Sequence, residues 1–223
     1  NTYAHLKTGM GWDQVAQTYH QTPVFQYLEN KPRHILDQML AKGINSPMTS
    51  SCGRLFDAVA AAMGICPDEV FFEGQAAMEL EALVDASTLH SEDEALAYPF
   101  AISALPDSYV PAIDPLPMWH ALLNDLQCQT SIPMMAARFH KGLAEAIATM
   151  VIHLTQSTST PLPFQTVALS GGVFQNRILF ELLKPKLERA GLTVLSHRRI
   201  PTNDGGLALG QAMVAAARAL NPF

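Results

Sequence analysis

Two glycine-containing segments in the last third of the chain have residue types suited to nucleotide binding. Gly171 and Gly172 follow the apolar run 165–169 and precede a helical pattern, and residues 203–206 precede the last helical pattern. Glycines let a ligand approach the backbone, and a helix start offers free N–H groups at the positive end of its dipole. The first segment predicts a seat for a nucleotide or phosphate, although a tight turn capped by Ser170 also explains it.

Polar side chains beside these glycines are candidate ligand contacts. Asn176, expected one turn into its helix, is placed to hydrogen-bond a ribose or base. Asp204 has two interpretations, as the N-cap of the last helix or as a hard oxygen ligand for a metal ion or Mg-phosphate. The strand–helix–strand–helix pattern predicts a parallel strand pair, and ligands bind outside the carboxyl ends of such strands. We therefore expect both turns to face one cleft.

The first half of the chain has further candidates at expected helix starts. Gly53 allows a ligand to approach, and Asp57, expected in the first helical turn, either complements the dipole or accepts from ribose hydroxyls. Glu73 and Gln75 are placed to line a pocket, but capping explains them as well. Cys52 lacks a nearby His or Asn that would activate it as a nucleophile.

The remaining motifs restrict the function class. His140 lies in a long helical pattern, where a structural, hydrogen-bonded histidine is the simplest interpretation. The sequence has no P-loop motif, no complete dinucleotide fingerprint and no G-x-S-x-G elbow. These absences argue against P-loop enzymes, fingerprint-type dinucleotide enzymes and α/β-hydrolases.

The elements that must position these residues follow from hydrophobic periodicity. Helices are expected over 13–41 (two, parted near Pro32), 54–64, 74–90, 117–126, 132–154, 175–190 and 206–220, and strands over 98–104, 108–113, 165–169 and 192–196. The strand over 165–169 is expected to be buried, and 157–163 is expected to be a linker. This order indicates an α/β fold with a mixed sheet and packed helices.

Composition excludes several classes of partner. The 223 residues are 48% hydrophobic and 15% charged, below the ~25% charge of typical domains, which suggests that apolar surface meets a partner or a missing part of the molecule. The net charge of −6 argues against nucleic-acid binding. The sequence contains no run of about 18 apolar residues, so it predicts no membrane span. Three cysteines without a C-x-x-C argue against a disulfide scaffold and favour a reducing cytoplasm.

Five ordered motifs together resemble the C-terminal part of the HypF family of hydrogenase maturation carbamoyltransferases. The resemblance covers about residues 46–219. The motifs are Ser50–Val59, Phe72–Glu81, Ala137–His140, Leu169–Asn176 and Asn203–Gln211.

This resemblance implies a fold and a reaction. The fold is a lobe of the actin/Hsp70/sugar-kinase (ASKHA) class, expected as a fragment of a two-lobe domain: residues 1–45 continue a helical segment from a missing upstream lobe, and 46–223 form the nucleotide-binding second lobe. The reaction moves a carbamoyl group from carbamoyl-adenylate, made from carbamoyl phosphate and ATP, to the C-terminal cysteine of HypE. That group becomes the cyanide ligands of [NiFe]-hydrogenase. The expected partners are a HypE-like acceptor and upstream domains of the same polypeptide.

The resemblance also implies site residues. A divalent metal is expected, and because the family's H-x-x-x-H pair is absent here, its remaining ligands should lie outside this chain, which is then inactive alone. The adenylate contacts are Gly171, Gly172 and Asn176, the ribose contacts Gly53 and Asp57, the metal ligand Asp204, and the candidate pocket residues Glu73, Gln75 and His140.

Three alternatives remain open. An ASKHA-type small-molecule kinase shares the glycine turns but needs a first-lobe phosphate hairpin and catalytic Asp. An O-carbamoyltransferase acting on a small-molecule hydroxyl is a second alternative. A non-catalytic docking module is a third, and it would not bind adenylates.

Overall fold

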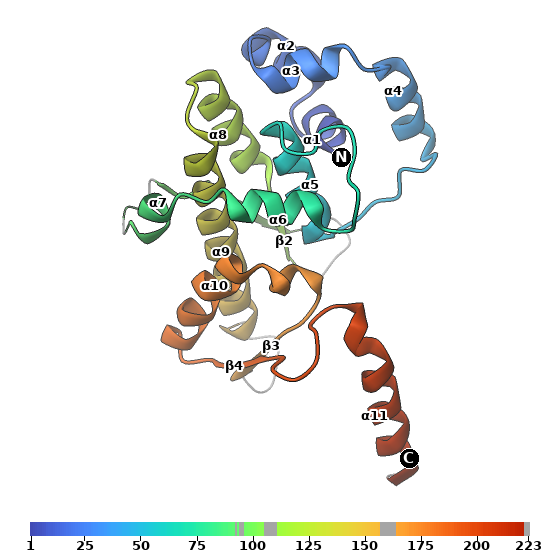
Figure 1. The fold of residues 1–223 in the computed structure, drawn as a ribbon, viewed down its shortest axis with the longest axis vertical. Coiled ribbons are helices and arrows are strands. Elements are labelled where there is room, and N and C mark those ends of the chain that lie inside the picture. Colours follow the sequence, from blue (N-terminus) through green and yellow to red (C-terminus); the bar gives the residue numbers. More distant parts are fainter. Residues whose placement is uncertain (92, 94–95, 105–110, 157–163, 221–223) are drawn as a thin grey trace. The chain divides into compact units, whose positions relative to one another are not determined.

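A computed structural model describes residues 1–223 apart from 92, 94–95, 105–110, 157–163 and 221–223. The chain divides into two compact units, Asn1–Ile147 (unit 1) and Ala148–Phe223 (unit 2). Figure 1 labels their helices and strands. A different division is expected from the sequence, with a helical segment over 1–45 and the nucleotide-binding lobe over 46–223. That division stays a prediction.

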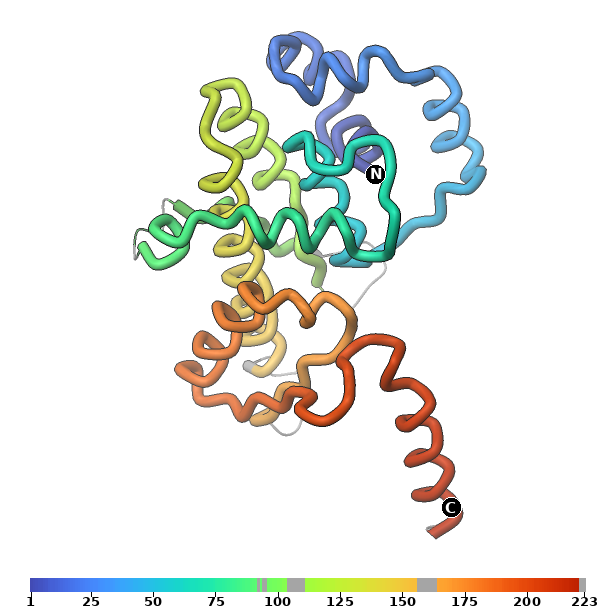
Figure 2. Tube along the Cα trace, in the orientation of Figure 1, coloured from blue at the N-terminus to red at the C-terminus, as the bar shows by residue number. Residues whose placement is uncertain are grey.

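Unit 1 begins with four short helices, which Figure 2 traces in blue. They are α1 (Thr2–Gly9), α2 (Trp12–Tyr19), α3 (Pro23–Glu29) and α4 (Arg33–Lys42). The prediction of two helices over 13–41 is wrong because a new helix starts at Pro23. The Thr22 hydroxyl caps it by accepting from the Phe25 N–H at 3.4 Å, and proline suits the first helical position.

The next three helices are α5 (Cys52–Ala62), α6 (Gln75–Ala82) and α7 (Ala86–His90). The prediction of one helix over 74–90 is wrong, since Asp85 starts a new helix by accepting from the Thr88 N–H at 2.7 Å. From the sequence, Asp57 is expected in the first turn of helix α5. That expectation is wrong, because α5 begins at Cys52 and Asp57 is its sixth residue.

Strands β1 (Ala101–Ala104) and β2 (Pro111–Asp114) pair antiparallel, with Ala101 opposite Asp114. Both predicted strands of this region therefore exist, with β1 beginning three residues later than predicted. The predicted turn between them, at Pro106 and Asp107, lies outside the described residues.

Helix α8 (Leu116–Gln127) and the part of helix α9 (Ile132–Gln156) up to Ile147 complete the core of unit 1. The helical spacing of apolar residues in α9 predicts that one stripe faces inward. Of that stripe, Met135, Phe139, Leu143 and Met150 are buried, whereas Leu154 near the end of the helix is exposed. The large side chains that are fully buried in unit 1 are Leu6, Phe56, Leu80, Met118, Trp119, Leu122, Leu123, Met135 and Phe139.

Unit 2 alternates strand, turn and helix, as the sequence predicted. Its elements are β3 (Thr166–Leu169), the 3-10 turn η2 (Gly172–Gln175), α10 (Arg177–Arg189), β4 (Thr193–Ser196), the 3-10 turn η3 (Asp204–Gly206) and α11 (Leu207–Leu220). Strands β3 and β4 pair in parallel, with Thr166 opposite Thr193 and Leu169 opposite Ser196, which confirms the predicted pair. Helix α10 buries Leu179, Leu183 and Leu187.

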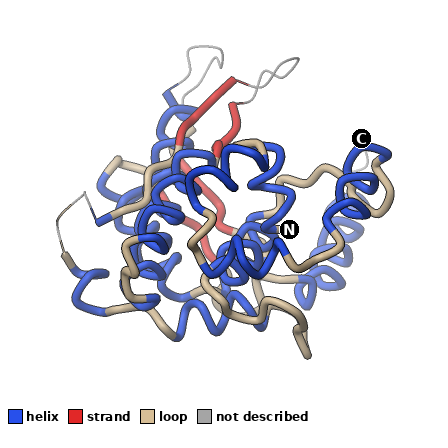
Figure 3. The backbone as a smooth tube through the Cα atoms, turned by 90° about the horizontal axis from the view of Figure 1, so that it is seen from above, coloured by secondary structure: helices blue, strands red, loops and turns tan. Residues whose placement is uncertain are grey.

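Two features of unit 2 differ from the sequence expectation. Strand β3 is not buried as predicted, because it belongs to a two-stranded sheet among the described residues and exposes Thr166 and Ala168. Helix α11 buries none of its residues, although it is rich in Leu, Ala and Met. Figure 3 shows the few strands in red among blue helices. The described chain therefore has an α/β fold as predicted, but its strands form two separate pairs, one antiparallel and one parallel, instead of the predicted mixed sheet.

Within the described ranges, no helix combines the length and the apolarity that crossing a membrane requires.

Candidate functional site

The backbone turns sharply after β3 at the first predicted glycine segment. Gly171 has φ 107° and ψ 157°, a conformation open essentially to glycine alone. An added Cβ there would meet no atom within 4 Å. Glycine is therefore required by the backbone conformation and not by a lack of room for a side chain. Gly172 begins η2 with ordinary φ, and a Cβ on it would touch only the Asn203 Cβ at 3.8 Å. The backbone of this turn is therefore open to an approaching ligand.

The second predicted segment forms the turn that starts η3. Asn203, not Asp204, is the cap, since its Oδ1 accepts from the Gly205 N–H at 3.1 Å. The capping interpretation of Asp204 is therefore wrong. Asp204 is the first residue of η3 and its side chain is exposed. Gly206 is packed closely, since a Cβ on it would lie 2.8 Å from the Pro201 carbonyl oxygen.

Hydrogen bonds join the two turns. The Gly171 N–H donates to the Thr202 carbonyl oxygen at 2.8 Å, and the Thr202 hydroxyl donates to the Gly171 carbonyl oxygen at 3.0 Å. One residue earlier, Ser170 Oγ lies 3.2 Å from His197 Nε2. The turns after β3 and β4 are thus side by side, as expected for the carboxyl ends of adjacent parallel strands.

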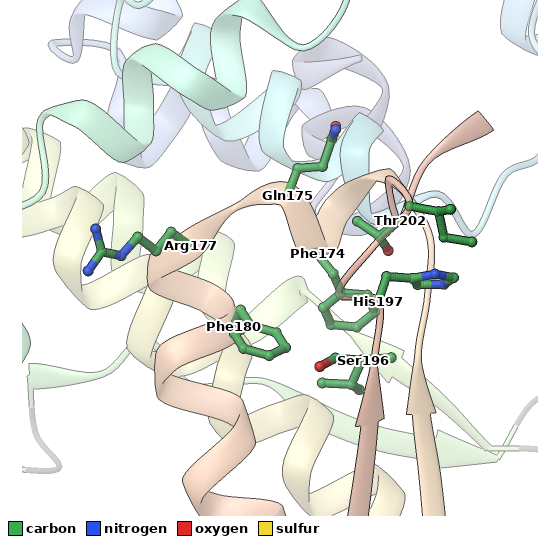
Figure 4. A pocket seen from close by; sticks show the side chains of 9 residues that line it. Phe174, Gln175, Arg177, Phe180, Ser196, His197 and Thr202 are labelled. Carbon is green, nitrogen blue, oxygen red and sulfur yellow. The ribbon is translucent and has the colours of Figure 1, made fainter. Parts of the chain in front are cut away.

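A depression of about 290 Å³ lies beside these turns, at the small end of ligand-pocket sizes. In Figure 4 the rings of Phe174 and Phe180 and the Ser196 side chain gather toward its centre, whereas the Gln175 and Arg177 side chains extend away. It is lined by Leu169, Phe174, Gln175, Arg177, Phe180, Ser196, His197, Ile200 and Thr202.

Sequence reasoning missed this lining. The signal that could have found part of it is the rule already applied to β3, because Ser196 and His197 stand at the carboxyl end of β4 in the same way.

Asn176 has a structural task in unit 2. It is buried, and its Oδ1 accepts from the Leu179 N–H at 2.8 Å, which makes it the N-cap of α10. The expectation that it lies one turn inside the helix is wrong, because α10 begins at Arg177. Its contact with a ribose or base stays a prediction.

The candidates at the start of α5 lie in unit 1. Ser51 caps this helix by accepting from the Arg54 N–H at 3.4 Å, and Gly53 is its second residue. The Asp57 carboxylate pairs with the Arg54 guanidinium at 3.1 Å and is 22% exposed. Burial raises the pKa of the Cys52 thiol to about 11, so this thiol is protonated at neutral pH. Ribose contacts from Gly53 and Asp57 stay predictions.

Gln75 and Glu73 stand at the start of α6, also in unit 1. Gln75 Oε1 accepts from the Phe71 N–H at 2.7 Å, and its Nε2 donates to Glu79 Oε1 at 2.7 Å. Gln75 therefore ties the preceding loop to the helix, but α6 begins without a side-chain cap, so the capping interpretation is wrong. Glu73 is exposed.

His140 is fully buried in unit 1. Its Nδ1 lies 2.8 Å from the Ala136 carbonyl oxygen, and its ring centroid is 5.4 Å from that of Phe56. Desolvation lowers its pKa to about 4, with the bond to Ala136 opposing the shift. This geometry agrees with a structural histidine that remains neutral at pH 7.

The predicted metal site lacks a sufficient donor set. Among the described residues, no three His, Cys, Asp or Glu side chains gather closely enough to hold a metal ion. The exposed carboxylate of Asp204 alone does not provide such a set, and its role as a metal ligand stays a prediction, with the remaining ligands expected outside this chain.

Comparisons with known proteins agree with this geometry. The model of a family described as the second subdomain of a carbamoyltransferase Kae1-like domain matches residues 1–211. Carbamoyltransferase HypF of Rhodobacter capsulatus is 41% identical over 191 residues, which cover 84% of this chain and 22% of that protein. Carbamoyltransferase HypF2 of Cupriavidus necator is 35% identical over 233 residues, which cover 94% of this chain and 28% of that protein.

Solved structures extend the likeness to three dimensions. A crystal structure of full-length HypF in the phosphate- and nucleotide-bound form matches with a TM-score of 0.72 and 33% identity, over 93% of this chain and 26% of that one. The HypF structure from T. kodakarensis matches with a TM-score of 0.67 at 23% identity, over 93% of this chain and 25% of that one, and shows the fold alone. These neighbours confirm the predicted ASKHA-like fold class.

This chain spans only 22% and 28% of the length of the two relatives described above. With the family model matched over residues 1–211 and the HypF relatives aligned over most of the chain, the chain belongs to the HypF family of carbamoyltransferases.

Proposed function

We propose that residues 165–206 hold the adenylate part of carbamoyl-adenylate during carbamoyl transfer by a HypF-type enzyme. One observation carries the proposal. The turns after β3 and β4 close on each other through the paired bonds between Gly171 and Thr202. This closure places an open glycine backbone beside a depression with two aromatic rings.

The chemistry of the depression suits a nucleoside. Phe174 and Phe180 offer apolar ring surface for a planar base, while Ser196, His197 and Thr202 offer polar groups around it. The full-length HypF of the crystal structure is in a phosphate- and nucleotide-bound form, which supports a nucleotide ligand for this chain as well.

The proposed reaction needs little acid catalysis from the protein. The cysteine thiolate of a HypE-like acceptor attacks the carbamoyl carbon of the mixed anhydride and forms a C–S bond. The C–O bond to the phosphate breaks, the electron pair goes to that oxygen, and AMP leaves. The thiol proton is lost to solvent beforehand. The residues of this chain bind and orient AMP.

The binding step can be tested on the whole 223-residue chain by calorimetric titration with AMP. We expect Gly172→Ala to weaken binding about tenfold, because the new methyl projects from the open turn while its 3.8 Å contact with Asn203 leaves the fold undisturbed. Gly210→Ala in α11, where a Cβ meets nothing within 4 Å, is the matched control and should bind like wild type. Equal AMP affinity of all three proteins would refute the proposed seat.

The transfer step is tested with synthetic carbamoyl-adenylate and a peptide of the HypE C-terminus. The proposal that other parts of a HypF polypeptide complete the site predicts AMP binding without accelerated transfer by this chain alone. Rapid thiocarbamate formation, measured by mass spectrometry, would contradict that expectation. Phosphorylation of a small substrate by ATP would instead favour a kinase of the same fold class.

A further inference from the structure

The segment between β4 and η3 is attached at both ends to the glycine turn. At its start, His197 Nε2 lies 3.2 Å from Ser170 Oγ. At its end, Thr202 exchanges two hydrogen bonds with Gly171. Residues 197–202, named here the tethered loop, are therefore held against two consecutive residues of the proposed nucleotide seat.

Two arginines stand between these attachment points. Arg198 and Arg199 are exposed, and neither forms an ion pair with any part of the chain that the structure describes. The guanidinium group offers a planar set of N–H donors that matches phosphate oxygens. Their position beside the seat makes them available to an anionic group of the ligand.

The charged residues of the chain are unevenly divided between the two units. Unit 1 contains 7 basic and 17 acidic residues, whereas unit 2 contains 7 basic and 3 acidic residues. A chain with net charge −6 thus concentrates positive charge in the unit with the glycine turns. Such an excess attracts anions.

Two other charged groups also lie near the seat. Arg177, which lines the depression, is paired with Glu181 at 2.6 Å. Asp204 follows the tethered loop and opposes anion binding. Of the arginines in this loop and in the lining of the depression, Arg198 and Arg199 are the ones without an ion-pair partner among the described residues.

We propose that Arg198 and Arg199 of the tethered loop bind the phosphate group of the ligand whose adenosine part lies at the Gly171 turn. This assignment rests on the proposed function for its nucleotide and adds the residues that recognise its phosphate. The glycine turn and the aromatic depression recognise the nucleoside, and the tethered loop recognises the anion.

The test separates the two parts of the ligand. Adenosine, AMP and inorganic pyrophosphate are titrated into the 223-residue chain and into the double variant Arg198→Gln/Arg199→Gln. An exposed charge pair contributes up to about a fivefold change in affinity, so the double variant should bind AMP and pyrophosphate about twentyfold more weakly. Its adenosine affinity should equal that of wild type.

The control is Arg218→Gln, which removes one exposed positive charge from α11 of the same unit. It should leave all three affinities unchanged, and circular dichroism should show the same helix content in every protein. A fall of about fivefold in AMP affinity in this control, which removes one charge where the double variant removes two, would overturn the assignment, because total charge would then explain the effect.

The outcomes separate this inference from the proposed function. If AMP binds and the double variant binds it equally well, the tethered loop is not the phosphate site, while the nucleotide seat stands. If adenosine does not bind but pyrophosphate binds through the arginines, the anion site stands and the nucleoside seat fails. If neither AMP nor pyrophosphate binds, both are refuted.

Discussion

Acidification should destabilise unit 1 through two histidines whose pKa values burial lowers, the fully buried His140 and the half-buried His5, and His140 is the more deeply buried of the two. His140 has no exposed surface, and its ring packs against Phe56 and Phe139 at centroid distances of 5.4 and 5.7 Å. Desolvation lowers its pKa from 6.5 to about 4, although the Ala136 carbonyl raises it again in part. The folded chain therefore keeps this ring neutral at pH values where the unfolded chain protonates it.

The sign and size of the effect follow from linkage. Because the pKa is lower in the folded state, the contribution to stability is complete above pH 6.5 and is lost as the pH falls toward 4. Between pH 7 and pH 5 the loss in unfolding free energy amounts to about 2 kcal/mol. Most carboxylates remain ionised over this interval, so histidines dominate the change.

The assay is urea unfolding at pH 7 and at pH 5, followed by tryptophan fluorescence. Both tryptophans of the chain, Trp12 and Trp119, lie in unit 1, so the signal reports this unit alone. At pH 7 the unfolding free energy of His140→Leu should be about 1 kcal/mol lower than that of wild type, because the hydrogen bond to Ala136 is lost. Between pH 7 and pH 5, the unfolding free energy of the variant should fall by about 2 kcal/mol less than that of wild type.

His34→Leu is the matched control, because His34 is exposed on α4 of the same unit. It should show the pH dependence of wild type. If His140→Leu lost as much stability as wild type between pH 7 and pH 5, burial of this histidine would not be the cause and the reasoning would be wrong.

Two more predictions follow from close backbone geometry and from charge. Gly142→Ala should lower the unfolding free energy of unit 1 by about 2 kcal/mol, measured by tryptophan fluorescence, because its Cβ would lie 2.9 Å from both the Tyr98 carbonyl carbon and the Tyr98 nitrogen. Asp204→Asn should raise AMP affinity about twofold in EDTA, measured by calorimetry, since a like charge beside the phosphate is removed.

Each of these has an outcome that contradicts it. Gly210→Ala, the helical control with open space around its Cβ, lies in unit 2 and should leave the tryptophan-detected unfolding of unit 1 unchanged, and an equally unchanged stability for Gly142→Ala would disprove the close contact with Tyr98. For Asp204, weaker AMP binding by the Asn variant in EDTA would show that the carboxylate supports the ligand directly. A loss confined to solutions with Mg²⁺ would support the predicted metal ligand.

Much of the candidate site could be predicted because its signals are local. An apolar run, two glycines and a helical repeat follow one another within 165–190, and the same order returns within 192–220. Such patterns depend on side-chain periodicity and on the backbone freedom of glycine, which act over a few residues. The parallel pair of β3 and β4 followed from the short connection through one helix.

Errors arose where a local signal had two meanings. Thr22 and Asp85 each cap a new helix inside a pattern that looked continuous, and capping residues also occur on helix surfaces. Asn176 was expected one turn inside its helix but caps α10, and Asn203 rather than Asp204 caps η3. A one-residue difference in a helix start changes the role of every polar side chain near it.

Residue order alone was enough to establish the α/β class, the parallel pair and the glycine turns, because these depend on short-range periodicity and backbone freedom. The folded chain was needed to show that Gly171 bonds to Thr202, that Ser170 meets His197 and that His140 is removed from water. Those contacts join residues far apart in the chain or depend on burial by several elements, so no local pattern encodes them.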